Sequence, residues 1–183
     1  MKLEYELRRS ARRTMSVEVR EDGSVLVRAP RRCPKRQIDR FLLEKQDWIR
    51  EKVKSQRERQ QRAEKVRPLS EAEAGLYKEK AREIIRLRTA YYASLMGVSF
   101  ERISIRDQKT RWGSCSDKGN LNFNWRLILA PPGVLDYVVV HELSHRKEMN
   151  HSPRFWEIVE EVMPDYRKYR SWLRENGGVL HRY

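Results

Sequence analysis

Long apolar runs are absent from this 183-residue sequence. The longest stretch without Asp, Glu, Lys or Arg is the twelve residues Thr89–Phe100, whereas a membrane-spanning helix needs about 20 apolar residues. The opening residues, MKLEYELRRSARR, contain neither the apolar region nor the small-residue cleavage site of a secretory signal peptide. The sequence therefore predicts a cytoplasmic protein without a transmembrane helix.

Cysteine is also scarce, because only Cys33 and Cys115 are present. Two cysteines cannot build a disulfide framework, and their separation excludes the CxxC spacing of a cysteine-based zinc module. We therefore interpret both as reduced thiols. A separate DNA-binding zinc finger is excluded on the same ground.

Acidic residues are outnumbered, with 26 Asp and Glu against 40 Lys and Arg. The formal net charge is +14, of which residues 1–67 carry +10. Such an excess attracts polyanions, but the aromatic residues that stack on bases are not interleaved with it in a recognisable motif. Non-specific DNA binding through this basic N-terminal region is thus a hypothesis that rests on charge alone.

The N-terminal third predicts a small subdomain. Residues 3–29 alternate with a period of two, which indicates strands and a hairpin around Asp22-Gly23. Apolar positions from Pro34 onward have helical spacing, and the polar stretch that follows them is either a helical extension or a linker. We predict a basic hairpin-plus-helix subdomain at residues 1–67 and a second domain at 68–183.

The second domain reads as a mixture of helices and short strands. Ser70-x-x-Glu73 is a capping box that begins a long helix ending near Gly97. Short strands are expected at Ile103–Ile105, in RWGSCS and along LNFNWRLILA. The valine-rich segment VLDYVVVHELSH suits a buried strand or a helix, and its His-Glu pattern favours the helix. The fold class is therefore α+β.

The segment HELSH is the strongest functional signal in the sequence. On a helix His141 and His145 lie one turn apart on the same face, so both imidazoles can bind one metal ion. Glu142 lies beside the first ligand, which is the position expected of a general base. A catalytic zinc ion needs a third protein ligand.

His151 is the leading candidate for that third ligand. A continuous helix would carry His151 away from the ligand face, so the helix must end before it. Asn150 is typical of a left-handed helix terminus, and Ser152-Pro153 is typical of a new helix start. The competing third ligands are acidic residues of the following helix: Glu157, Glu160 and Glu161.

The stretches RWGSCS, NWRL, HELSH, NHSPRFW and PDYRKYRSWLRENG occur in this order, and together they resemble the YgjP-like metallopeptidase family, relatives of the SprT-like and WLM zinc proteases. The resemblance covers Arg111 to Gly177 densely. It implies a zincin-like domain with a small mixed sheet and an HExxH active-site helix, preceded here by the hairpin and long helices. It also implies zinc bound by His141, His145 and His151. Glu148 stands where metzincins have glycine, so their turn is not expected.

The resemblance implies a zinc metallopeptidase that hydrolyses a peptide or protein substrate with a zinc-activated water and Glu142 as general base. Tyr166, Tyr169 and Arg170 are candidates to stabilise the oxyanion. Two alternatives remain from the residues: a zinc hydrolase of small amides, and a nucleic-acid-associated protein.

Overall fold

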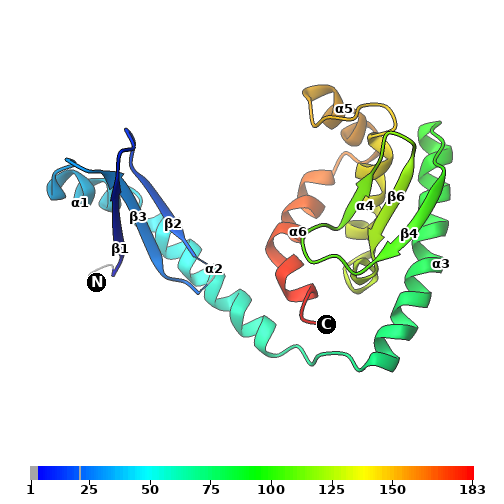
Figure 1. The fold of residues 1–183 in the computed structure, drawn as a ribbon, viewed down its shortest axis with the longest axis horizontal. Helices are drawn as coiled ribbons and strands as arrows, with labels where there is room; N and C mark the ends of the chain where they lie inside the picture. The colour runs from blue at the N-terminus through cyan, green and yellow to red at the C-terminus, as the bar shows by residue number, and fades with distance from the viewer. Residues whose placement is uncertain (1–3, 21) are drawn as a thin grey trace. The chain divides into compact units, whose positions relative to one another are not determined.

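A computed structural model describes residues 4–20 and 22–183 (Figure 1). The chain divides into two compact units, Met1–Lys65 and Val66–Tyr183, and each has its own hydrophobic core. The first unit contains β1 (Glu6–Ser10), β2 (Ser16–Val19), β3 (Val25–Pro30), α1 (Lys35–Glu44) and α2 (Gln46–Glu64). The second contains α3 (Glu71–Met96), β4 (Arg102–Arg106), β5 (Gly113–Cys115), β6 (Asn120–Asn124), the 3₁₀ helix η1 (Trp125–Leu129), α4 (Pro132–Ser144), α5 (Pro153–Val162) and α6 (Tyr166–Leu180).

The first unit is a three-stranded sheet in the order β1-β3-β2 with two helices. β2 and β3 pair antiparallel as the predicted hairpin, while β1 pairs parallel to β3. Val25 and Val27 of β3 are buried with Ile38 of α1 in the core of this unit. The single helix expected from Pro34 is instead two helices that meet at Lys45. The polar stretch SQRERQQRAE is the second half of α2, which is helical as far as Glu64.

The second unit begins with α3, the long helix that the capping box predicts. The Ser70 hydroxyl accepts the Glu73 backbone N–H, and the Glu73 carboxylate accepts the Ser70 N–H, so two unpaired donors of the first turn are satisfied. The helix ends at Gly97, whose φ of 62° lies in the left-handed region that glycine tolerates best. No helix in the described part of the chain is long and apolar enough to cross a membrane.

The sheet of the second unit has the order β4-β6-β5, with β4 parallel and β5 antiparallel to the central strand. Leu121 and Phe123 of β6 are fully buried on the face that the helices cover. The strand expected along LNFNWRLILA ends early, because Asn124 caps the 3₁₀ helix η1 by accepting the Arg126 N–H. A side chain that satisfies a backbone donor in this way competes with continued strand pairing.

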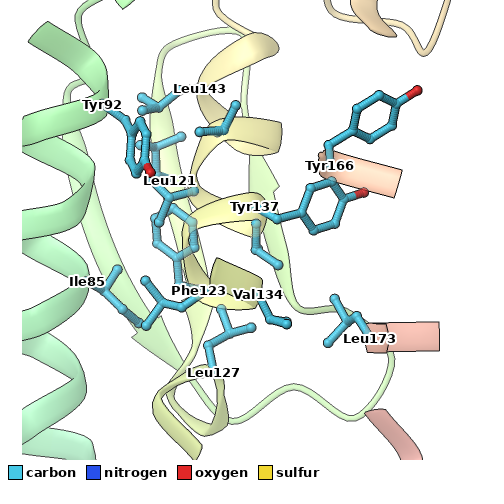
Figure 2. Close-up of a cluster of buried hydrophobic side chains, with 14 of the residues drawn as sticks. Ile85, Tyr92, Leu121, Phe123, Leu127, Val134, Tyr137, Leu143, Tyr166 and Leu173 are labelled. Carbon is cyan, nitrogen blue, oxygen red and sulfur yellow. The ribbon is translucent and has the colours of Figure 1, made fainter. Parts of the chain in front are cut away.

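The helix α4 is the centre of the second unit. It contacts both α3 and α6, and Val138, Val139 and Val140 are almost completely buried. Figure 2 shows Val134 and Leu143 of this helix in the core with Phe123 and Leu127. The valine run has no helical preference of its own, so tertiary burial stabilises the helix here. The α+β class and the helical HELSH segment are both confirmed.

A bidentate ion pair joins α3 to α4. The Arg88 guanidinium donates hydrogen bonds of 2.6 and 2.7 Å to the two carboxylate oxygens of Asp136, and the Asp136 side chain is only 13% exposed. Paired charge-assisted bonds of this kind are stronger than single surface contacts.

We expect Asp136→Asn to lower the free energy of unfolding by about 1–2 kcal/mol, because one charge-assisted bond is lost. Asp165→Asn is the matched control, since Asp165 pairs with exposed Lys168 and such pairs contribute about 0–1 kcal/mol. Urea unfolding of both variants measures the difference. Equal losses would contradict a special role for the Arg88–Asp136 pair.

Candidate metal centre

The C-terminal end of α4 carries the two histidines of HELSH. The α-helix ends at Ser144, whose hydroxyl donates to the Val140 carbonyl oxygen, and His145 is its C-terminal cap. His141 and His145 therefore lie one turn apart at an end of the helix, where the chain turns away. The helical spacing on which the metal hypothesis depends is present in the structure.

The path from His145 to α5 differs from the sequence prediction. No described residue other than glycine has a positive φ, so Asn150 is not left-handed. The helix ends earlier, because the Arg146 and Lys147 N–H groups bond to carbonyls three residues back and tighten the last turn. Asn150 instead accepts the Ser152 N–H with its side-chain oxygen. Ser152 then caps α5 by accepting the Phe155 N–H, as predicted.

This turn brings His151 back to the two histidines of α4. One nitrogen from each of His141, His145 and His151 lies within 4.8 Å of the others. The Nε2 atoms of His141 and His151 are 3.1 Å apart. In the described part of the chain, this is the one group of three or more His, Cys, Asp or Glu side chains that could hold a metal ion.

Phe155 supports all three imidazoles from the interior. Its ring is fully buried, and its centroid lies 4.9, 4.6 and 4.8 Å from those of His141, His145 and His151. Trp156 packs beside two of them, at 5.8 Å from both His141 and His151. The first turn of α5 therefore holds the cluster in place by packing.

The two histidines of α4 have the protonation states that metal binding requires. The Nδ1 of His145 lies 3.1 Å from the Glu148 carbonyl oxygen, so Nδ1 carries the proton and Nε2 keeps its lone pair. Burial, helped by the two neighbouring histidines, lowers the pKa of His141 to about 3. Burial also lowers the pKa of His145. Both imidazoles are therefore neutral near pH 7.

The separation of His141 and His151 fits two ligands of a tetrahedral ion. With metal–nitrogen bonds of about 2.0–2.1 Å, two ligands of a tetrahedral site are about 3.3 Å apart, close to the separation between His141 and His151. The buried Nδ1 of His141 has no hydrogen-bond partner among the described residues. A cation between the two facing Nε2 atoms would use the lone pair of each, and the proton of His141 would then lie on Nδ1. Three imidazoles are a typical zinc ligand set.

Glu142 lies beside the cluster without joining it. The residue is 5% exposed, and burial raises the pKa of its carboxyl group to about 8. Its side chain lies against β5: a Cβ added at Gly113 would be 2.5 Å from the Glu142 Oε1. The absence of a side chain at Gly113 is therefore what leaves space for the carboxylate.

The three acidic alternatives to His151 lie outside the cluster. Glu157 bonds to Arg154 on its own helix, and Glu160 pairs with Arg167 at 2.8 Å. Glu161 is not part of the histidine cluster either. The structure thus brings together the four residues that the sequence singled out and leaves the glutamates of α5 apart.

The oxyanion candidates separate into two packing residues and one exposed cation. Tyr166 is buried and stacks on Tyr137 and Trp156, with its ring beside that of Tyr137 in Figure 2. The Tyr169 ring fills the space next to Gly133. Arg170 is exposed, and its guanidinium lies 4.4 Å from the Trp156 ring. Of the three, Arg170 is exposed, Tyr169 is half-buried and Tyr166 is buried.

Sequence reasoning missed three contributions to the site. Phe155 was not recognised as the support of the ligands, and its only sequence signal is its place in the first turn after the Ser152 cap. The Glu148 carbonyl that orients His145 is a backbone group, which no residue pattern reveals. Gly113 lies within RWGSCS, but its contact with Glu142 depends on how β5 meets α4.

The α+β fold and the three-histidine cluster are compatible with a metallopeptidase. A sequence model described as "YgjP-like, metallopeptidase domain" matches residues 13–75 and 69–176. The chain therefore belongs to the YgjP-like metallopeptidase family, whose members are metal-dependent hydrolases of peptide bonds.

Two solved structures are similar to this chain. One is the metallopeptidase zymogen abylysin of Pyrococcus abyssi, 22% identical, covering 49% of this chain and 90% of its own, with a TM-score of 0.45. The other is the metallopeptidase zymogen jannalysin of Methanocaldococcus jannaschii, 18% identical, covering 50% and 94%, with a TM-score of 0.44. No curated protein matches the sequence.

Proposed function

We propose that this chain is a zinc-dependent peptidase in which His141, His145 and His151 hold the ion and Glu142 is the general base. One observation carries the proposal: three imidazole nitrogens converge within 4.8 Å beside a buried carboxyl group that is not part of the cluster. Three histidines leave one position of a tetrahedral zinc ion for water or substrate.

The chemistry divides between the ion and the chain. Bound zinc lowers the pKa of a coordinated water toward about 7 and polarises the carbonyl group of a substrate. Glu142 accepts the proton of the attacking water and donates it to the leaving nitrogen. The absence of a side chain at Gly113 gives this carboxylate its room against β5.

The strand β5 supports an extended peptide rather than a small amide as substrate. β5 is at the edge of its sheet, paired with β6 on one side, and it contacts α4. An extended substrate can pair with such an edge through backbone hydrogen bonds, which would place its main chain beside Glu142. Such pairing recognises the backbone of the substrate, so any preference for particular side chains must come from other contacts.

DNA binding remains a hypothesis that rests on the excess of positive charge in residues 1–67. Neither the family match nor any contact in the described residues adds support to it. The peptidase proposal does not depend on that charge, because its site lies wholly within the second unit.

We expect the purified protein to bind about one zinc ion per chain, and His151→Ala to weaken that binding at least about a hundredfold, since a ligand contributes more than the outer contacts that orient it. The matched control is His181→Ala, because His181 stacks on Trp112 outside the cluster. Competition with a chromogenic chelator measures both affinities. Unchanged affinity in the His151 variant would show that the third ligand lies elsewhere.

Glu142→Gln preserves size while removing the basicity of the carboxylate. We expect zinc content to stay the same and peptide hydrolysis to fall at least about a hundredfold, with the loss in kcat rather than in KM. The comparison uses one peptide substrate and enzyme samples of equal zinc content. Equal cleavage rates for the wild type and the variant would rule out this role for Glu142.

Gly113→Ala tests the position of the carboxylate. The added Cβ would meet Oε1 of Glu142 at 2.5 Å, so the flexible carboxylate must move while the imidazoles stay in place. We expect zinc affinity to be retained and kcat to fall at least about tenfold. Gly178→Ala is the control, because a Cβ there meets no atom within 4 Å. Equal kcat values for the two variants would mean that the exact carboxylate position is unimportant.

A further inference from the structure

A second concave site lies at the other edge of the β4-β6-β5 sheet. It is a groove of about 820 Å³ between α3 and β4, lined by three residues of α3 and by residues 100–106. We call it the α3–β4 groove. β4 pairs with β6 alone in this sheet, so one side of its backbone has no strand partner. Figure 1 shows the helix and the strand running beside one another.

The α3–β4 groove is strongly basic. Its lining includes four arginines and a single carboxylate, that of Glu101, and the arginines are Arg82 and Arg86 from α3 with Arg102 and Arg106 from β4. Several cations that share one hollow repel one another, and a concave surface focuses their field. An anion in the groove would relieve that repulsion.

The arginines are poorly neutralised by the chain itself. Within residues 4–20 and 22–183, no ion pair or hydrogen bond is formed by the side chains of Arg86 and Arg102. Arg82 pairs with Glu79 on its own helix, but both side chains are exposed and such pairs contribute little. Arg106 donates a hydrogen bond to the side-chain amide oxygen of Asn122, which is neutral. These guanidinium groups are therefore available to an external carboxylate.

The two pairs of arginines approach the sheet edge from opposite faces. Ile103 and Ile105 pack against the core on the face that α3 covers, so Arg102 and Arg106 project from the other face. Arg82 and Arg86 come from the side of the helix α3. An added strand beside β4 would thus have cations on both of its faces.

The spacing of these cations also matches an extended chain. Residues four apart on a helix are separated by about 6 Å along the axis, and residues two apart on a strand by about 6.6 Å. Arg82 and Arg86 can therefore meet alternate side chains of one strand. Charges on β4 by themselves would serve to prevent edge-to-edge aggregation, but that need does not explain arginines on the helix.

We propose that the α3–β4 groove binds an acidic, extended segment of another protein, which pairs with β4 as a fourth strand. Carboxylates on its two faces would meet the arginines of α3 and of β4. A second copy of this chain is disfavoured, because two β4 edges would oppose arginine to arginine. A nucleic acid offers phosphates but no peptide backbone to pair with the strand. The proposal is independent of the catalytic role of Glu142.

The test uses the full-length chain carrying Glu142→Gln, which prevents cleavage of the probe. The probe is a short fluorescein-labelled peptide of glutamate and threonine, and the same peptide with glutamine for glutamate is the neutral comparison. We expect Arg86→Glu with Arg102→Glu to weaken binding of the acidic probe at least about tenfold. Arg86→Gln with Arg102→Gln should weaken it in the same direction, and circular dichroism confirms that each variant is folded.

The matched control is Arg36→Glu with Arg50→Glu, which changes net charge equally at exposed positions of the first unit. We expect this control to change affinity less than about twofold. An equal loss in both pairs would overturn the proposal, because affinity would then follow net charge. Tighter binding of a single-stranded oligonucleotide through the same arginines would overturn it as well.

Hydrogen exchange tests the pairing with β4. We expect the bound acidic probe to slow amide exchange in residues 102–106, because strand addition protects backbone N–H groups. Binding that depends on the arginines but leaves exchange in this strand unchanged would overturn the fourth-strand arrangement.

Discussion

The burial of α4 is the constraint on which the second unit depends. A helix that is covered on nearly all sides normally carries apolar residues alone, because an unpaired polar group in the interior is costly. Here the same helix carries His141, Glu142 and His145 near its C-terminal end. The dry surroundings keep the imidazoles neutral and hold the proton on the carboxyl group to unusually high pH. Neutral imidazoles suit a metal site, and the charge of a bound cation would lower the pKa of the carboxyl group again, as the role of a base requires.

The sequence predicted which histidines come together better than it predicted the boundaries of the elements around them. The i, i+4 histidines require a helix for chemical reasons, and Ser152-Pro153 is a local start signal, so both predictions depend on nearby residues alone. The prediction of a left-handed Asn150 was wrong. The chain turns earlier, because the N–H groups of Arg146 and Lys147 bond to carbonyls three residues back. Such tightening of a last turn depends on backbone geometry that many side chains tolerate.

Two boundaries in the fold illustrate the same limit. The strand at LNFNWRLILA ends at Asn124 because that side chain caps η1, although the following residues are as apolar as those of a strand. The helix expected from Pro34 is interrupted at Lys45, where nothing in the residue pattern marks a stop. Apolar periodicity reports which residues are buried, whereas the ends of elements depend on local competition for single hydrogen bonds.

Phe155 couples the metal cluster to the hydrophobic core. One fully buried ring touches all three imidazoles, so the three candidate ligands and the residues that hold α5 against α4 belong to one packed group. By thermodynamic linkage, an ion that binds only the folded cluster stabilises this packing, and good packing in turn raises affinity for the ion. Removal of the ion should therefore loosen the interface between α4 and α5 as well as the packing of the three histidines.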